Sequence, residues 1–445
     1  MAKAAQRKSK SITGRHSPKK KGPMPFSPLD LEDEKLLEYV QRQTFRFFWE
    51  AAHPVSGLVP DRQSTQGETA ADLIGIGGTG FGIMAIIVAV ARGWVSREDA
   101  LHRIGRMLDL LTRATCFHGV YPHFMNGRTG APIPFSRKDD GGDLVETSYL
   151  FMGLLCAREA FNDDSPIERH LRQRITALWE EVEWNWHTQG GRKVLYWHWS
   201  PNNGWSLDHE IQGWNECLIT YVLAASSPRY AIEADVYHRG FAAGRDFLNG
   251  RTYYGIELPL GPPHGGPLFF AHYSFCGLDP RGLKDRYADY WEQNFRHVMI
   301  NREHCVRNPY GHKGYGAECW GLTASDDPSG YAAHSPTNDD GTISPTAALA
   351  SFPYAPKEAM QVLRHFFSAH GDRIWGRYGF IDAFCEEQGW YADSFLAIDQ
   401  GPIIIMIENY RSGLLWKLFM RIPEIQAGLR KLGFASPYLE DNRAK

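Results

Sequence analysis

The sequence predicts an all-α fold of the (α/α)6 barrel type, in which long loops at one end form an acidic, aromatic-lined cleft. The first observation is that about a dozen segments repeat apolar residues at the spacing of amphipathic helices. The second is that strand-like alternation is confined to short pieces such as residues 192–199. The third is that long loops rich in Gly, Pro, Asp and aromatic residues separate the helical segments. Helices joined by such alternating connections fit two concentric rings, and long ordered loops commonly carry function.

The first expected helix covers residues 32–51, where Leu36, Val40 and Phe47 recur on one face. The glycines between residues 77 and 82 are expected to form a tight turn between helices, because they lack the strand and the spacing of a dinucleotide-binding loop. Long loops are expected at 117–143, 197–213, 249–274 and 301–344. Further helices are expected at 80–92, 97–113, 144–161, 166–186, 214–225, 232–248, 283–296, 345–350, 356–369, 396–408 and 410–419.

The chain of 445 residues is expected to form one domain over residues 27–445, preceded by a disordered basic tail over residues 1–26. No Pro/Ser-rich linker divides the body, and large barrels reach this length as a single unit. A hydrophobic fraction of 43% with 22% charged residues is typical of a soluble globular protein. Aromatic residues make up 13% of the chain, which fits a carbohydrate cleft, although most of them must belong to the core.

The net charge of −3 is unevenly distributed. Residues 1–26 hold eight basic and no acidic residues, which leaves 40 basic against 51 acidic residues in the body. The body is therefore mildly acidic and has no electrostatic footprint for nucleic acid. No apolar stretch is long enough for a membrane span, and the tail lacks the apolar core of a signal peptide. These features predict a cytoplasmic location, with the periplasm as the alternative.

Seven scattered cysteines without CxxC pairing predict reduced thiols. Cys305 lies beside His304, with His312 further on, but this spacing is too loose to predict a zinc site. The sequence also lacks a phosphate-binding P-loop, a G-x-S-x-G nucleophile elbow and an H-E-x-x-H pair. The sequence thus gives little support to a structural zinc, a bound nucleotide or these hydrolase chemistries.

A cluster of acidic residues precedes the apolar run at residues 150–155. It contains Asp139, Asp140, Asp143 and Glu146, and a glycine pair between Asp140 and Asp143 allows a tight turn. Crowded carboxylates should push one another's pKa values apart, which is how two such groups acquire different roles in acid/base chemistry on a polyol. A structural alternative has about even weight: Asp143 is an N-cap and Glu146 folds back to its amide, forming a capping box.

Glu216 is the second acidic candidate, at the start of an apolar helical run. An apolar neighbour such as Trp214 would raise the pKa of its carboxyl toward the range that a general acid needs. The alternative is a glutamate in a first helical turn, favoured by the helix dipole. The preceding loop favours function, because a purely structural loop rarely needs so many indoles. The candidate sugar-binding tryptophans of this region are Trp197, Trp199, Trp205 and Trp214.

Three further loops supply candidate substrate contacts. In the loop after Ala324, Asp, Asn, Ser and Gly are first of all turn formers, so Tyr331 and His334 are better candidates for sugar contact. Asp399 precedes a buried helix, where an N-cap and a cleft carboxylate are equally weighted alternatives. The remaining candidates are Tyr391, Gln400, His272 and Tyr273.

Together these motifs resemble the glycoamylase-like domain of glycoside hydrolase family 144, over about residues 33–434. The resemblance rests on runs beginning at Gly78, Asp140, Tyr196, Gly213, Ala271, Trp320 and Ala397. It implies an (α/α)6 barrel that hydrolyses linear or cyclic β-1,2-glucan with inversion of the anomeric centre. It implies short sophoro-oligosaccharide products and no metal or cofactor. Secreted members of the family carry a signal peptide, which sets this chain apart.

The resemblance places the important acidic residues on Asp139, Asp143, Glu146 and Glu216. Glu216 is expected to be the general acid. Asp143 or Glu146 is the first choice for the base, with Asp399 in reserve, because enzymes of this group activate water indirectly. The alternatives are exo-action or transglycosylation on the same glucan, a noncatalytic glucan-binding protein, and hydrolysis of an α-glucan. The expected partner is a β-glucan chain, and the oligomeric state stays open.

Overall fold

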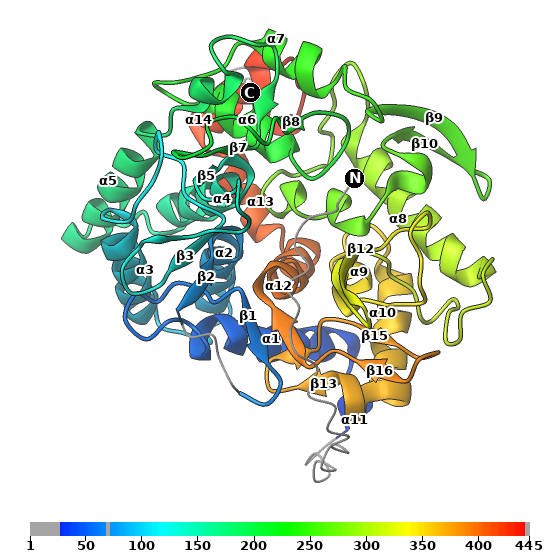
Figure 1. The fold of residues 1–445 in the computed structure, drawn as a ribbon. Coiled ribbons are helices and arrows are strands. Elements are labelled where there is room, and N and C mark those ends of the chain that lie inside the picture. The colour runs from blue at the N-terminus through cyan, green and yellow to red at the C-terminus, as the bar shows by residue number, and fades with distance from the viewer. Residues whose placement is uncertain (1–26, 68–71, 441–445) are drawn as a thin grey trace.

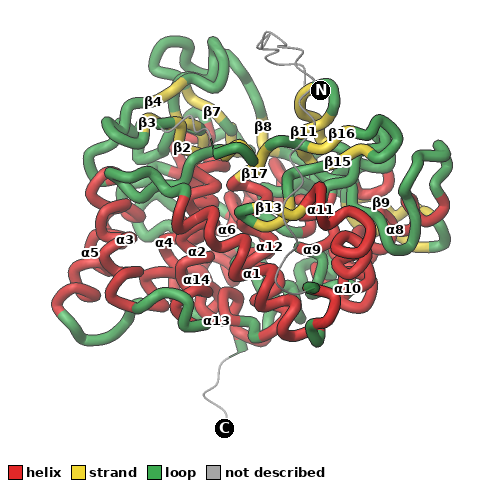
Figure 2. Tube along the Cα trace, turned by 90° about the horizontal axis from the view of Figure 1, so that it is seen from below, coloured by secondary structure: helices red, strands yellow, loops and turns green. Residues whose placement is uncertain are grey.

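The computed structural model describes residues 27–67 and 72–440 of the chain. The expected disordered tail at residues 1–26 lies outside the described residues. Helices pack together below a layer of loops and short strands (Figure 2). Figure 1 looks onto this loop-bearing end, with α12 near the centre and the other helices around it. The expectation of a helix-rich fold is confirmed.

The expected helices at 32–51, 97–113 and 144–161 are confirmed within a few residues. The longer helices are α1 (Asp33–Glu50), α2 (Ile76–Ala91), α3 (Arg97–Leu111), α4 (Leu144–Ala160), α5 (Pro166–Glu180), α6 (Leu218–Ser226), α8 (Tyr290–Arg307), α10 (Pro356–His365), α12 (Ala397–Arg411) and α14 (Pro423–Lys431). The shorter ones are α7 (Ala234–Val236), α9 (Pro345–Leu349), α11 (Gly371–Ile374) and α13 (Leu414–Met420).

The strands are short, form small antiparallel sheets, and mostly lie in the loops at one end (Figure 2). One pairing joins distant segments: β1 (Arg62–Ser64) with β17 (Ser394–Leu396). Another pairs β5 (Gly142–Asp143) with β7 (His198–Trp199), with Asp143 opposite His198. The other strands are β2 (Leu73–Gly75), β3 (Phe124–Asn126), β4 (Pro132–Ile133), β6 (Leu195–Tyr196), β8 (Glu210–Ile211), β9 (Leu248–Tyr253), β10 (Ile256–Leu260), β11 (Ala324–Asp327), β12 (Gly330–Ala333), β13 (Trp375–Gly376), β14 (Gly379–Phe380), β15 (Phe384–Cys385) and β16 (Trp390–Tyr391).

Several helix predictions were wrong. The expected helix at 232–248 breaks into α7, a π-helical turn at Tyr237–Phe241, and the start of β9. The helix expected at 283–296 begins only at Tyr290, because Asp289 caps it by accepting from the amides of Trp291 and Glu292. Helix α14 was missed altogether. Local apolar spacing does not reveal where a side-chain cap starts a helix.

The expected glycine turn at 77–82 is also wrong, because these glycines lie inside α2. Their function is close packing. A Cβ atom added to Gly80 would lie 2.0 Å from the carbonyl oxygen of Tyr149, and one added to Gly153 would lie 2.2 Å from that of Gly80. Backbone therefore meets backbone where α2 crosses α4. Helix α2 also packs against α12, and α4 packs against α6, so these four helices form a connected group.

The seven cysteines all lie in the described residues and are free thiols, as expected. Within the described part of the chain, no helix is both long enough and apolar enough to cross a membrane.

We predict that Gly153→Ala destabilises the protein by roughly 1–3 kcal/mol, because the added methyl group meets rigid backbone at an over-packed contact. Gly105→Ala is the matched control. Gly105 lies in α3 with open space around its Cα, so alanine should stabilise the protein by about 0.5–1 kcal/mol. Chemical denaturation of both variants measures the effect. Equal or greater stability of Gly153→Ala relative to Gly105→Ala would contradict the packing argument.

Candidate active site

The N-terminal ends of α4, α6 and α12 each carry a carboxyl group. Asp143 and Glu146 lie at the start of α4, Glu216 lies two residues before α6, and Asp399 lies in the first turn of α12. The fourth member of this helix group, α2, offers its N-terminal amides to the same region. A helix N-terminus favours negative charge. The fold therefore gathers acidic side chains at the loop-bearing end.

Asp143 is fully buried and its carboxylate is saturated with donors. Its Oδ1 accepts hydrogen bonds from the amides of Val145 and Glu146, at 3.0 and 2.9 Å. Its Oδ2 accepts from His123 Nδ1 at 3.0 Å and lies 3.4 Å from His198 Nε2. Burial alone would raise the pKa of Asp143, but hydrogen bonds from the two histidines hold it well below its ordinary range. Asp143 is therefore a permanent anion.

His123 and His198 are the cations that match this anion. Burial lowers the pKa of each histidine, but neighbouring carboxylates raise it by more. These carboxylates are Glu146 and Asp143 for His123. For His198 they are Asp139 and Asp143. The pKa of His123 rises to about 10 and that of His198 to about 9. Both imidazoles are therefore charged at neutral pH. His198 Nε2 also contacts Asp139 Oδ2 at 3.0 Å, and Asp139 is buried beside it.

Only one of the two contacts of the expected capping box is present at the start of α4. Asp143 is the N-cap of α4, but Glu146 does not fold back to its amide, which donates to Tyr121 O instead. Glu146 Oε2 accepts a 2.6 Å hydrogen bond from the Gly77 amide, in the first turn of α2. Burial raises the pKa of Glu146 to about 7; the His123 charge opposes the shift and the Asp143 charge adds to it. The side chain lies deep but keeps some contact with solvent.

Glu216 is likewise deep and partly exposed. Burial first, and then the charges of Asp143 and Glu146, raise its pKa to about 7. Trp214 is only 2% exposed and packs against the core rings of Phe247 and Tyr290, so its indole has little surface for a sugar.

Two tyrosines lie within range of the Glu216 charge. The Glu216 charge contributes to the raised pKa values of Tyr149 and Tyr273, after burial as the main cause. The two tyrosine rings meet edge to face, with centroids 5.7 Å apart. Aromatic side chains from α4 and from the segment before α8 therefore lie in the region of Glu216.

Three of the four candidate tryptophans keep accessible surface. Trp197 stacks on His209 with ring centroids 4.9 Å apart, next to His198. Trp199 packs edge-on against His118, and Trp205 packs edge-on against His187. These indoles remain available to a sugar ring, whereas Trp214 does not.

Three other residues that were predicted to contact sugar have buried side chains. His272 is 2% exposed, its Nε2 is 3.0 Å from Ser351 Oγ, and burial lowers its pKa to about 3. His334 is buried at the base of the β11–β12 hairpin beside Asp340. Gln400 donates to Phe380 O in the core. Tyr331 is instead half-exposed on the hairpin.

Asp399 and Tyr273 are buried but belong to a polar network. The Tyr273 hydroxyl donates to Asp399 Oδ1 at 3.4 Å. Burial raises the pKa of Asp399 to about 7, and burial with the Asp399 charge raises that of Asp382 well above its ordinary value. The two carboxyls therefore hold a proton between them. Asp382 Oδ2 in turn accepts from the Asp326 amide at 2.7 Å.

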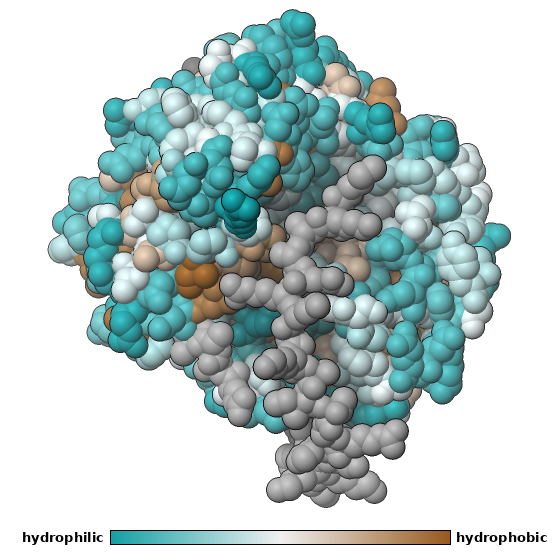
Figure 3. Space-filling model, in the orientation of Figure 1, coloured by the Kyte–Doolittle hydropathy of each residue, from teal (hydrophilic) through white to brown (hydrophobic). Residues whose placement is uncertain are grey.

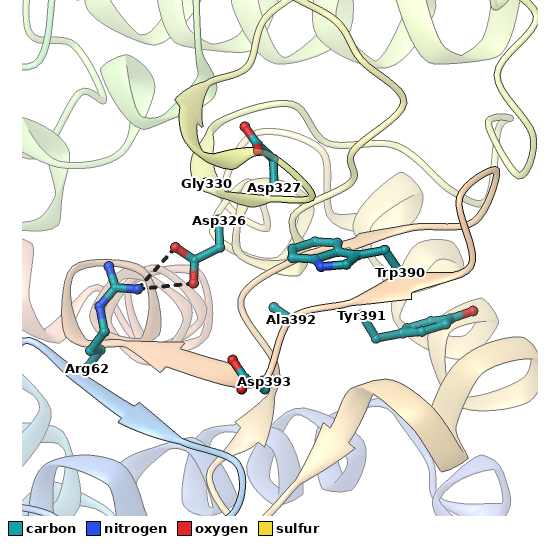
Figure 4. Close-up of a pocket in the computed structure, with 8 residues that line it drawn as sticks. All are labelled: Arg62, Asp326, Asp327, Gly330, Trp390, Tyr391, Ala392 and Asp393. Atoms are coloured by element: carbon teal, nitrogen blue, oxygen red, sulfur yellow. Dashed lines mark hydrogen bonds and ion pairs between the residues drawn. The ribbon is translucent and has the colours of Figure 1, made fainter. Parts of the chain in front are cut away.

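A pocket of about 470 Å³ lies next to this network (Figure 4). The Trp390 indole extends toward the ion pair of Arg62 and Asp326, while Tyr391 points the opposite way. Tyr391 stacks on Phe384 with its hydroxyl buried, and part of its side chain also lines the pocket. Consecutive residues of a strand point to opposite faces, so the indole and not the phenol ring extends toward the ion pair. The sequence analysis did not select six residues of the site: Arg62, His123, His198, Asp326, Asp382 and Trp390. Of these, only Trp390 had a signal in the sequence, the alternation of side chains along a strand.

Three groups in the described residues bring potential metal ligands within 4.8 Å of one another: Asp139 with Asp143 and His198; Asp327 with His334 and Asp340; Cys319 with His365 and His370. In the first group the charge state favours ion pairing, because a protonated His198 has no lone pair to offer a metal. The pKa of His334 in the second group is also raised, by its bond to Asp340 against the effect of burial. The expectation of no metal stays a prediction.

Comparisons with known proteins agree on one family. Residues 208–423 match the family model described as "Putative glucoamylase". The chain is 44% identical over 423 residues to an exo β-1,2-glucooligosaccharide sophorohydrolase (non-reducing end) of Parabacteroides distasonis. That match covers 90% of this chain but only 58% of the relative's length.

Two solved structures are similar over nearly the whole chain. A "putative glucoamylase" from Bacteroides uniformis is 57% identical with a TM-score of 0.90, and the match covers 92% of this chain and 100% of that one. An endo-β-1,2-glucanase from Chitinophaga pinensis, in complex with sophorotriose and glucose, is 50% identical with a TM-score of 0.90 and the same coverage.

We predict that Glu216→Gln stabilises the protein increasingly as pH rises from 5 to 8. The folded-state pKa of about 7 lies above the ordinary 4.5, so the folded state holds this proton more tightly. The stability that the proton supplies is present at low pH and lost as pH rises through this window. Glutamine removes that loss. Thermal melts of both proteins at each pH measure the difference.

The control is Glu233→Gln, since the Glu233 side chain is 77% exposed. Its melting temperature should follow that of the parent protein at every pH. A Glu216→Gln difference that does not change with pH would contradict the raised pKa.

Proposed function

We propose a function from the family to which this chain belongs, the glycoamylase-like family 144 of glycoside hydrolases. The protein hydrolyses β-1,2-glucan, linear or cyclic, with inversion of the anomeric centre, and releases short sophoro-oligosaccharides. The observation that carries the proposal is the pair of Glu146 and Glu216. Both are deep, partly exposed carboxyls with pKa values raised to about 7, in a chain that resembles named β-1,2-glucan hydrolases.

The architecture that supports this function is an (α/α)6 barrel with its cleft at the loop-bearing end. Helices α2, α4, α6 and α12 belong to the inner ring and direct their N-termini toward the cleft. The face seen in Figure 3 is largely hydrophilic, with apolar side chains gathered left of centre. Such a mixture suits a glucan, whose hydroxyls need polar partners and whose ring faces pack on apolar surface.

Glu216 acts as the general acid. Its raised pKa keeps the carboxyl protonated near neutral pH, so that it can protonate the glycosidic oxygen as the bond breaks. The Tyr149 and Tyr273 rings exclude water from one side and maintain this pKa. Asp143 and His123 do not transfer protons themselves, because their charges are locked together.

Glu146 acts as the base. Unlike Asp143 and Asp139, it keeps exposed surface, and only one of its oxygens is engaged, by the Gly77 amide. That amide favours the ionised form that a base needs. Glu146 takes a proton from water directly or through a substrate hydroxyl. Inversion requires room for that water, so we expect the two carboxyls to lie roughly 6.5–9.5 Å apart with substrate bound.

Endo-action is the form we propose, because the Chitinophaga pinensis endo-β-1,2-glucanase matches along its whole length. The exo-acting relative is longer, and this chain spans 58% of it. Product analysis on linear β-1,2-glucan separates the two modes. A ladder of intermediate lengths early in the reaction supports endo-action, whereas sophorose alone from the start supports exo-action.

We predict that Glu216→Gln lowers kcat on β-1,2-glucan by roughly 10²- to 10⁴-fold, the range of a lost general acid. The fold should persist, because glutamine keeps the shape of the side chain. Reducing-end release, with soluble starch as a second substrate, measures the effect. Glu233→Gln should retain full activity. Retained activity in Glu216→Gln would remove its assignment as the acid, and cleavage of starch alone would remove the proposed linkage.

We predict a bell-shaped dependence of kcat/KM on pH around neutrality. Below the optimum the base Glu146 is protonated, and above it the acid Glu216 is ionised. Because the two carboxylate charges repel, the ionisation of one carboxyl raises the pKa of the other. The acidic and alkaline limbs of the pH profile are therefore separated. Glu146→Gln should lower activity by at least about 10²-fold and remove the acidic limb.

Asp399→Asn is the competing variant for the base. If it removes the acidic limb while Glu146→Gln leaves that limb in place, the base is Asp399. Proton NMR of the first-formed anomer tests inversion in the wild-type enzyme.

A further inference from the structure

The pocket beside β1 and β16 has a chemistry that no step of the proposed hydrolysis uses. It is formed by segments distant in the sequence, namely the start of β1, the β11–β12 hairpin, and β16 with the residues after it (Figure 4). It is lined by Arg62, Asp326, Asp327, Gly330, Trp390, Tyr391, Ala392 and Asp393. The pocket lining has three carboxylates and one guanidinium group, so its net negative charge disfavours an anionic ligand. Together with a single indole they suit a neutral polyol, whose hydroxyls donate to the carboxylates and whose apolar ring face covers the indole.

The polar part of the pocket is held in place before any ligand binds. Arg62 Nη1 lies 3.1 and 3.2 Å from the two carboxylate oxygens of Asp326, and Ser394 Oγ donates to Asp326 Oδ2. The Asp326 amide is fixed by Asp382. A carboxylate has about four lone-pair sites. Asp326 therefore keeps acceptor capacity for a ligand hydroxyl, and little side-chain ordering remains to oppose binding.

The aromatic part is equally defined. Trp390 and Tyr391 are consecutive in β16 and point to opposite sides, so only the indole extends toward the Arg62–Asp326 pair (Figure 4). The Trp390 side chain is partly exposed, unlike that of the core Trp214. A flat apolar surface bordered by fixed acceptors is the arrangement that recognises the face and edge of a hexose.

The pocket is linked to the acidic cluster, but neither Glu146 nor Glu216 lines it. Asp61, beside Arg62, is among the charges that act on Glu146. Strand β17, paired with β1, leads directly into the first turn of α12, where Asp399 lies. On the other side, Asp326 connects through Asp382 to Asp399 and Tyr273. A glucan bound at Glu146 and Glu216 would therefore need additional sugar units to reach Trp390.

We propose that this pocket is a distal subsite, in which Trp390 stacks on a glucosyl unit while Asp326 and Arg62 hold its hydroxyls. The subsite rests on the proposed function. It makes binding depend on chain length, because only glucans long enough to extend from the catalytic carboxyls to Trp390 gain the contact. Specificity for longer chains thereby arises outside the reacting sugar pair.

The test uses the full chain with Glu216→Gln to prevent turnover and β-1,2-linked gluco-oligosaccharides of two to seven units. Titration calorimetry should show affinity rising with length up to the unit that reaches the pocket. Adding Trp390→Ala should weaken binding of the long oligosaccharides by roughly 2- to 10-fold, the range of an aromatic contact, and leave the shortest unchanged. Trp390→Phe should restore part of the loss, and Asp326→Asn should weaken the same long ligands.

The control is Tyr410→Ala, since Tyr410 is 42% exposed at the other end of α12 and should alter no affinity. In the active enzyme, Trp390→Ala should raise KM for long chains with kcat unchanged. If Trp390→Ala weakens all lengths equally or none, the subsite is wrong although the hydrolase function stands. If the wild type cleaves no β-1,2-glucan and Glu216→Gln binds none, both proposals fail.

Discussion

The interaction on which the site depends is the buried carboxylate of Asp143 with its four donors. Two are amides of the helix that it caps, and two are imidazolium groups from other segments. One side chain therefore starts α4, fixes the orientation of His123 and His198, and places a permanent negative charge beside Glu146 and Glu216. A buried charge is stable only when its partners are complete, so losing any one donor would disturb the others.

The second constraint is the close contact of α2 with α4. Without side chains at Gly80 and Gly153, the two backbones meet directly, and the N-terminus of α2 lies close enough for the Gly77 amide to hold Glu146. The His123 carbonyl accepts from the first amide of α2, so the segment that supplies the imidazolium also fixes this helix end. Packing and electrostatics are thus two results of one arrangement.

The acidic residues of the site and most long helices could be predicted from the sequence, because carboxylate clusters and apolar spacing are local signals. Their partners could not. His123 meets Asp143 across 20 residues and Asp382 meets Asp399 through tertiary packing, and neither histidine nor aspartate has a local signature. The glycines of α2 were misassigned for the same reason, since a glycine run signals a turn unless a neighbouring helix needs the space. The aromatic residues show the same limit. Trp214 and Trp390 look alike in sequence, and only the fold buries one and exposes the other.

The distribution of positive charge determines which carboxyls carry protons. Two imidazolium groups contact Asp143, which thereby stays ionised although it is buried, and one of them also contacts Asp139. Glu146 has an amide as its direct partner, and no cationic side chain among the described residues forms an ion pair with Glu216, so burial and the nearby anion raise the pKa of both toward neutrality. Within the described part of the chain, Asp382 and Asp399 form no ion pair, and the two carboxyls hold a proton between them. A carboxyl can transfer protons when it has no cation in direct contact and is partly exposed. Among these carboxyls, only Glu146 and Glu216 satisfy both conditions. The roles of acid and base therefore follow from where the histidines lie.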